Sequence, residues 1–247
     1  MADVSVSFGA VRALDGVSLA VREGAFVGLI GPNGAGKTTL FNAITGFVAP
    51  SAGRVRLTGR RIDGWSPARR ARAGVARTFQ NIGLDQQATV LDNLRVAREG
   101  GPLAAELRLV LGAHHNGDGS AHRTGELLER LGLRPVVHER VDQLPVGTAK
   151  LVELVCVLLR RPRLLLLDEP SSGLGPPERL RLGELLRDLH RNEDLSVLMI
   201  EHDMALAMST VDYLYVLNFG TLLAEGTPDQ VRGDARVIEA YLGKAAP

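Results

Sequence analysis

The sequence predicts an α/β protein with a mainly parallel sheet, and two observations support this. Apolar runs rich in Val, Ile and Leu alternate with helical patterns, and a glycine-rich loop joins the first of these buried runs to a helix. The 247 residues, 45% apolar and 23% charged, are enough for one large domain with a buried core. No apolar run reaches the roughly 18 residues that span a bilayer.

The order of the predicted elements is as follows. We expect strands at residues 25–30, 54–58, 75–79, 164–167, 196–200 and 212–218, with helices at 38–45 and 177–191. Between residues 90 and 159 the periodicity is helical, with candidate helices at 90–97, 103–111, 125–131 and 149–159. The sequence therefore predicts one domain, 1–247, whose core (1–80 and 162–247) carries an inserted helical subdomain at 81–161.

A phosphate-binding loop follows the first buried strand. Residues 31–38 fit the pattern G-x-x-x-x-G-K-[ST] between a strand and a helix, which is the setting that this motif requires. Its glycines let backbone N–H groups turn toward anionic oxygens, and the next helix directs its N-terminus at them. We expect Lys37 to neutralise the terminal phosphates of a nucleotide and the Thr38 hydroxyl to bind Mg²⁺. The expected nucleotide-binding residues are Gly31, Pro32, Asn33, Gly34, Ala35, Gly36, Lys37, Thr38 and Thr39.

Two acids follow a second apolar strand. Four leucines at 164–167 precede Asp168 and Glu169, at the strand end where open α/β sheets bind ligands. We expect Asp168 to hold Mg²⁺ and Glu169 to polarise the water that attacks the γ-phosphorus. None of the three lysines follows an asparagine, so the Asn-Lys-x-Asp element that reads guanine is absent and ATP is the expected nucleotide.

Charge and composition argue against a nucleic-acid partner. The net charge is +1 and aromatic residues are only 4%, too few for a surface that stacks bases. Eight arginines lie between Arg54 and Arg77 with Asp63 as the only acid, and we interpret them as solvated positions. The polar stretch at 114–122 contains three histidines but reads as a loop rather than a metal site. One cysteine and no secretory signal are typical of a reducing cytoplasm.

These motifs, in this order, resemble the ATP-binding subunits of ABC transporters, and the resemblance runs over nearly the whole chain. It implies a P-loop NTPase core, with an antiparallel β part near the N-terminus and an inserted helical subdomain. It also implies that Phe8 stacks on adenine, that Gln80 lies near Mg²⁺ and the attacking water, and that His202 reaches the γ-phosphate. The expected catalytic residues are Glu169, His202, Gln80 and Lys37, and the expected metal ligands are Thr38, Gln80 and Asp168.

In detail the chain is similar to the branched-chain amino-acid uptake ATPases of bacteria. The similar segments are ARTFQNI at 76–82, VLDNL at 90–94, EHDM at 201–204 and VIEAYLG at 237–243. This resemblance implies a head-to-tail dimer, with a second copy or a paralogous subunit, that binds two ATP molecules. It also implies contact with integral-membrane permease subunits at the cytoplasmic face of the cell membrane, and import of branched-chain or related amino acids.

The sequence departs from the family pattern in two places. The family's Leu-Ser-Gly-Gly-Gln segment, which covers the partner's γ-phosphate, reads LPVGT at 144–148, so the serine hydroxyl is lost. Backbone N–H groups at Gly147 can still bind an anion, and Thr148 is expected to cap the next helix. Gly175 replaces an Asp or Asn expected to act across the dimer. Two alternatives stay open: a soluble ABC-type ATPase of DNA repair or ribosome function, and a non-hydrolysing nucleotide-binding regulator.

Overall fold

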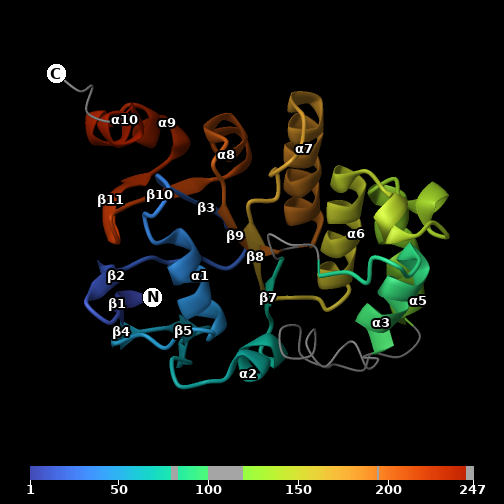
Figure 1. Ribbon diagram of the computed structural model, residues 1–247, viewed down its shortest axis with the longest axis horizontal. Helices are drawn as coiled ribbons and strands as arrows, with labels where there is room; N and C mark the ends of the chain where they lie inside the picture. Colours follow the sequence, from blue (N-terminus) through green and yellow to red (C-terminus); the bar gives the residue numbers. More distant parts are fainter. Residues whose placement is uncertain (79–82, 100–118, 194, 243–247) are drawn as a thin grey trace.

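The structure is a computed structural model, and it describes residues 1–78, 83–99, 119–193 and 195–242. A six-stranded sheet forms its centre, in the order β11-β10-β3-β9-β8-β7 (Figure 1). The strands from β10 to β7 in this order are all parallel, and β11 pairs antiparallel with β10. Their bounds are β3 Phe26–Ile30, β7 Val75–Arg77, β8 Leu164–Asp168, β9 Ser196–Ile200, β10 Tyr213–Asn218 and β11 Thr221–Gly226. This arrangement confirms the α/β class and the mainly parallel sheet.

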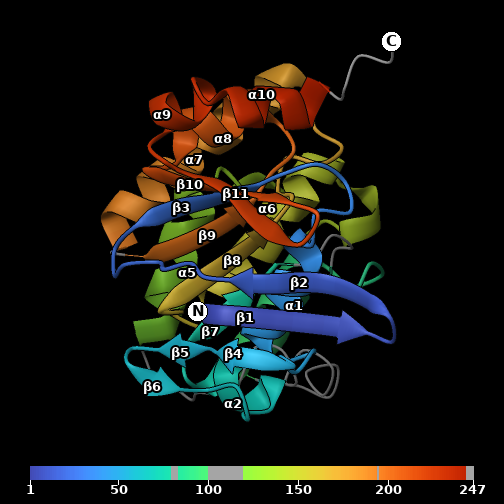
Figure 2. The same cartoon turned by 90° about the vertical axis from the view of Figure 1, so that its left-hand side faces the viewer.

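A smaller antiparallel sheet is formed by the N-terminal strands and lies beside the large one (Figure 2). Its order is β2-β1-β4, with β1 Ala2–Phe8, β2 Val11–Val17 and β4 Ala52–Arg54. The single strand predicted at 54–58 is wrong. The chain leaves β4 at Arg54 and enters a separate ribbon of β5 Arg56–Leu57 and β6 Arg60–Arg61, because Val55 bonds to Ile62 and Asp63 instead.

Alternate residues of the central strands face two different cores. On β3, Phe26 and Ile30 belong to the core beneath α6, α7 and α8, whereas Val27 and Leu29 belong to the core that includes α1 and the antiparallel sheet. Both faces of the sheet are therefore covered, which explains why its strands read as continuous apolar runs. Figure 1 shows α7, α8, α9 and α10 on one side of the sheet and α1 on the other.

Two helices of these layers, α1 and α7, were predicted from the sequence, and both begin and end close to their predicted positions. The helix bounds are α1 Lys37–Thr45, α2 Pro67–Arg72, α7 Pro176–Glu193, α8 Met204–Thr210, α9 Pro228–Arg232 and α10 Ala235–Leu242. Helices α2, α8, α9 and α10 and strand β11 were not predicted from the sequence. Strands β1 and β2 confirm the antiparallel β part near the N-terminus that the family resemblance implies, although no bounds were predicted for them. In the part of the chain that the structure describes, no helix is long and apolar enough to cross a bilayer.

The region between β7 and β8 is helical. It contains α3 Val90–Glu99, α5 Gly119–Arg130, α6 Val146–Leu158 and the short 3-10 helices η1 Arg134–Val136 and η2 Val141–Gln143. Among its described residues there is no strand, only an isolated bridge between Thr89 and Arg140. The helical insert is thus confirmed. Its limits at 81 and 161 stay a prediction, and the helix predicted at 103–111 lies outside the described residues.

Two of the eight clustered arginines are buried, which corrects the prediction that all are solvated. The guanidinium of Arg70 donates to the carbonyl oxygens of Ala43 and Ile44 at the end of α1, at 2.5 and 2.8 Å. It thereby satisfies helix-terminal carbonyls that would otherwise need water. The other buried arginine, Arg77, lies in the functional site.

Candidate nucleotide-binding site

The loop between β3 and α1 has the backbone shape that its glycines predict. Gly31, Gly34 and Gly36 all have positive φ, at 150°, 78° and 102°. A Cβ at Gly36 would lie 2.7 Å from the carbonyl oxygen of Ala13, so only glycine fits there. Gly36 is also the N-cap of α1 and has no side chain to occupy the first backbone N–H groups of the helix. These N–H groups and the helix dipole form an anion-binding site.

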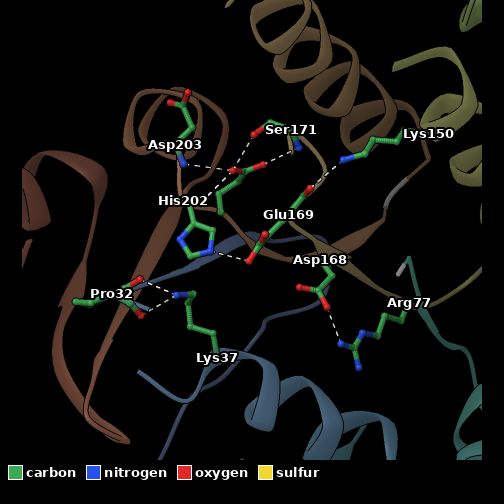
Figure 3. A network of polar contacts seen from close by, with 11 residues as sticks. Pro32, Lys37, Arg77, Lys150, Asp168, Glu169, Ser171, His202 and Asp203 are labelled. Carbon is green, nitrogen blue, oxygen red and sulfur yellow. Dashed lines mark hydrogen bonds and ion pairs between the residues drawn. The ribbon is translucent and has the colours of Figure 1, made fainter. Parts of the chain in front are cut away.

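Lys37 is the first residue of α1 and is buried. Its ammonium donates to the carbonyl oxygens of Gly31 at 2.6 Å and Pro32 at 3.0 Å, so its charge lies in the middle of the loop (Figure 3). Burial lowers the pKa of Lys37, and the carboxylates of Glu169 and Asp168 oppose that shift. A cation in this position is suited to the β- and γ-phosphates of a nucleotide.

Asp168 ends β8 with a buried carboxylate that makes an ion pair. Its Oδ2 accepts from Arg77 Nη2 at 2.6 Å, while Arg77 Nη1 donates to Asn42 on α1 at 2.7 Å. The other oxygen, Oδ1, is buried with no hydrogen-bond partner in the described residues. A free carboxylate oxygen and the Thr38 hydroxyl are hard oxygen donors, the type that Mg²⁺ binds together with waters and phosphate oxygens. The residues present therefore fit a magnesium ion.

Glu169 and His202 lie within hydrogen-bond distance of each other. The Nε2 atom of His202 is 2.6 Å from Glu169 Oε1, and both residues follow the carboxyl ends of adjacent parallel strands, β8 and β9 (Figure 3). Glu169 has φ 49°, a backbone conformation that costs energy for a residue with a side chain and that is concentrated at functional sites. The pair joins a carboxylate suited to a general base with an imidazole that fixes its position.

Glu201 holds the segment that carries this pair. Its carboxylate is buried and accepts from the backbone N–H and hydroxyl of Ser171, both at 2.9 Å, and from His202 N at 3.0 Å. The same segment is also held by Lys150 of α6, which donates to the carbonyl oxygens of Glu169, Pro170 and Ser172, at 3.3, 3.2 and 2.6 Å. The backbone that bears Glu169 is thus fixed from two directions.

One cavity joins most of these groups. It has a volume of about 420 Å³, within the range of small-molecule sites, and Lys37, Glu169 and His202 all line it. Its wall also includes Val11, Arg12, Ala13, Asn33, Gly34, Ala35, Gly36, Thr38, Thr39, Phe219 and Gly220. Asp168 is not among the residues of this wall, although it directly precedes Glu169 in the sequence.

The predicted site residues that are not among the described residues of this wall are Gly31, Pro32, Asp168, Phe8 and Gln80. Gly31 and Pro32 contact Lys37 through their carbonyl oxygens, and Asp168 directly precedes Glu169. Phe8 ends β1 with a side chain that is 53% exposed, and it is not among the residues of the cavity wall. Gln80 lies outside the described residues. Adenine stacking by Phe8 and metal or water contact by Gln80 therefore stay predictions.

Comparison with known proteins agrees with this geometry. The model of the ABC transporter family matches residues 14–172, and that of the branched-chain amino acid ATP-binding cassette transporters matches residues 221–247. The chain belongs to the ABC transporter family.

Similar proteins place this ABC ATPase among the LivG and BraF group. It is 40% identical over 242 residues, 96% of this chain and 94% of the relative, to the high-affinity branched-chain amino acid transport ATP-binding protein LivG of Salmonella typhimurium. It is 40% identical over 245 residues to BraF of Pseudomonas aeruginosa, covering 98% of this chain and 96% of that protein. A solved ATP-binding cassette in its ADP conformation is 31% identical with a TM-score of 0.84, covering 98% of this chain and 97% of the other.

The altered segment of this ABC ATPase precedes α6. Pro145 is the N-cap of that helix, with no side-chain hydrogen bond to the first turn. The expectation that Thr148 caps the helix is wrong, because Thr148 lies within the first turn of α6, after the helix has begun at Val146. None of residues 144–148 lines the cavity at the phosphate loop.

Three charged residues of this site were not predicted from the sequence: Arg77, Lys150 and Glu201. Glu201 carries the same signal as Asp168, since it directly follows an apolar strand, β9, next to β8. Arg77 is a charge inside an apolar stretch at the end of β7, which indicates a buried partner. Lys150 gives no such signal, because its partners are backbone carbonyls distant in sequence.

Proposed function

We propose that this chain is the ATP-hydrolysing subunit of an importer for branched-chain or related amino acids, and that it drives integral-membrane permease subunits from the cytoplasmic face of the membrane. The single observation that carries the catalytic part is the cavity in which Lys37, Glu169 and His202 meet. The transport part is supported by similarity to LivG and BraF over nearly the full length of the chain. That similarity favours transport over DNA repair, ribosome function or a non-hydrolysing regulator.

The phosphates of ATP would bind at the start of α1. The loop N–H groups and Lys37 would hold the β- and γ-phosphates, with Lys37 exchanging its bonds to Gly31 and Pro32 for phosphate oxygens. Thr38 and Asp168 would hold Mg²⁺, which neutralises phosphate charge when it is bound. Arg77 keeps one carboxylate oxygen of Asp168 fixed, and so leaves the other oxygen for the metal side.

Glu169 would orient the attacking water and accept its proton. Its carboxylate lies in the cavity, and the 2.6 Å contact with His202 limits the directions that it can take. Phosphoryl transfer depends mainly on positioning and charge stabilisation. The fixed carboxylate of Glu169 would supply the positioning of the water, while Lys37 and the loop N–H groups would supply the charge stabilisation. We further propose that the active form is a head-to-tail dimer with a second copy or a paralogous subunit, in which residues 144–148 approach the partner's γ-phosphate.

Replacing Glu169 by Gln tests the catalytic proposal. E169Q keeps the shape and removes the base, so we expect ATP turnover to fall at least 100-fold while the Kd for ATP changes less than threefold. The matched control is Glu184→Gln, an exposed glutamate on α7, which should leave both values unchanged. Turnover is measured by phosphate release and affinity by calorimetry; undiminished release from E169Q would refute the role of Glu169.

The transport proposal needs a separate measurement. Vesicles containing the complete transporter should accumulate labelled leucine, isoleucine or valine in an ATP-dependent manner, and vesicles carrying E169Q should not. Uptake of labelled glutamate serves as the specificity control. If the intact transporter hydrolyses ATP but accumulates none of the three branched-chain amino acids, the substrate assignment is wrong while the ATPase assignment stands.

A further inference from the structure

Arg179, near the start of α7, joins two segments of the candidate site. Its Nε donates to the carbonyl oxygen of Leu174 at 2.8 Å, and its Nη1 donates to Oδ2 of Asp203 at 2.9 Å. Leu174 belongs to the loop that follows Glu169, and Asp203 directly follows His202. One guanidinium therefore connects the segment after β8 with the segment after β9.

Asp203 is held on both of its carboxylate oxygens. Oδ1 accepts from Leu206 N at 2.9 Å, which makes Asp203 the N-cap of α8, and Oδ2 accepts from Arg179. The hydrogen bond from the Leu206 backbone is the largest cause that lowers the pKa of Asp203, and Arg179 lowers it further. The backbone N–H of Asp203 also donates to the carboxylate of Glu201 at 3.3 Å (Figure 3). The residue next to His202 is thus fixed by three contacts.

The loop at residues 171–175 is bound to this segment at both of its ends. Glu201 accepts from the first residue of the loop, and Arg179 donates to the carbonyl oxygen of its fourth residue, Leu174. Both of these charged side chains also bind the segment that carries His202. The loop and that segment are therefore expected to move together.

The ion pair between Arg179 and Asp203 is partly exposed, since 39% and 24% of the two side chains are accessible. Exposed ion pairs contribute little to stability, because water screens the charges and two side chains lose freedom. A role in folding alone is therefore a weak explanation for this contact. The segments that it joins are those that bear Glu169 and His202, whose Oε1 and Nε2 atoms lie 2.6 Å apart.

We propose that Arg179 is a positioning residue for His202, on which it acts through Asp203. By tying this aspartate to the loop that follows Glu169, it keeps the imidazole of His202 beside the carboxylate of Glu169. The loop carries Gly175, where the family resemblance implies a side chain that acts across the dimer, so a movement of the loop would be transmitted to His202. This inference rests on the proposed function, because it concerns the rate of ATP hydrolysis.

Arg179→Met tests the proposal, because it removes both donors and keeps an unbranched apolar stem. The phosphate loop is untouched, so kcat should fall about tenfold while the Kd for ATP changes less than twofold. Arg179→Lys keeps the charge without the planar fork, so its kcat should lie between those of the parent and R179M. Arg181→Met, at an exposed arginine on the same helix, is the matched control and should change neither value. Phosphate release and calorimetry on the full chain measure kcat and Kd.

A double-mutant cycle with His202→Gln separates positioning from a purely structural role. In the H202Q chain, R179M should lower the residual kcat less than twofold, whereas a structural role would lower it by the same tenfold as in the parent. If R179M does not fold, the cycle is run with R179K, whose kcat should fall about threefold in the parent and stay unchanged in H202Q.

Three results would overturn the proposal. They are an unchanged kcat in R179M or, where that variant does not fold, in R179K; an equal loss in R181M; and an undiminished effect of the Arg179 substitution in the H202Q chain. A parent chain that hydrolyses no ATP would instead refute the proposed function itself, and this result is distinct from the other three.

Discussion

The protein contains two helices whose N-termini are suited to phosphate, and they differ sharply. Helix α1 begins after a glycine loop with positive φ at Gly31, Gly34 and Gly36, and its first residue is a buried lysine. Helix α6 begins after Pro145, in extended conformation with φ −54° and ψ 144°. The loop before α1 has a backbone shape that can enclose an anion, whereas the segment before α6 presents only a helix end. We propose that the first binds the phosphates of this chain's own nucleotide, and that the second approaches the nucleotide of a partner subunit.

The two helices also share a feature. Lys37 on α1 and Lys150 on α6 each donate to carbonyl oxygens of a nearby loop, and burial lowers the pKa of both. The loop bound to Lys37 is the one that we propose holds the phosphates, while the loop bound to Lys150 carries Glu169. If the proposed roles are right, the same type of contact supports binding in one region and catalysis in the other, and substitutions should separate the two.

The largest effect is expected from alanine at the glycines. Gly36→Ala places a Cβ 2.7 Å from the Ala13 carbonyl oxygen at φ 102°, so ATP affinity should fall more than 100-fold and stability by about 2–4 kcal/mol. Gly147→Ala places its Cβ 3.0 Å from a leucine methyl in the first turn of α6, where alanine is a better helix former, so stability should stay within about 1 kcal/mol. Calorimetry and denaturant unfolding measure both; equal losses would contradict the comparison.

The phosphate loop and the pair of Glu169 and His202 also differ in how far each could be predicted from the sequence. The phosphate loop depends on local rules, glycine at positive φ between a strand and a helix, so Gly31 to Thr39 could be identified directly. Asp168 and Glu169 followed from the end of an apolar strand. The bond between Glu169 and His202 joins residues 33 apart, and it depends on β8 and β9 being neighbours, which the sequence pattern does not specify.

Tertiary packing explains the remaining errors. Arg70 and Arg77 lie in an arginine-rich stretch that is polar by composition, yet packing against α1 and β8 buries both. Thr148 is a favourable capping residue, but α6 begins two residues before it. Composition and propensity describe one segment at a time, whereas these outcomes depend on which segment packs beside it.

The two lysines give the next largest effect. Lys37→Met should weaken ATP binding about 100-fold, because a charge-assisted contact to the phosphates is lost. Lys150→Met should lower kcat about tenfold and change the Kd for ATP less than threefold, since it loosens the backbone of Glu169 and Ser172 rather than the phosphate loop. Phosphate release and calorimetry on the same preparations distinguish the two. A loss of ATP affinity in Lys150→Met equal to that in Lys37→Met would show that the two loops are not separate in function.

The smallest effect concerns the start of α6. Helix α6 has Pro145 as its N-cap and no side-chain cap. Pro145→Ser replaces the proline ring with a side chain that carries a hydroxyl, whereas Pro145→Ala removes the ring and adds no hydroxyl. The serine variant should be more stable than the alanine variant by about 1 kcal/mol, the usual contribution of an N-cap, measured by denaturant unfolding. In an E169Q background, ATP-dependent dimerisation followed by light scattering should also strengthen several-fold for serine over alanine, because the hydroxyl would donate to the partner's γ-phosphate. Identical dimerisation of the two variants would mean that this helix end contributes to the partner's site through its backbone alone.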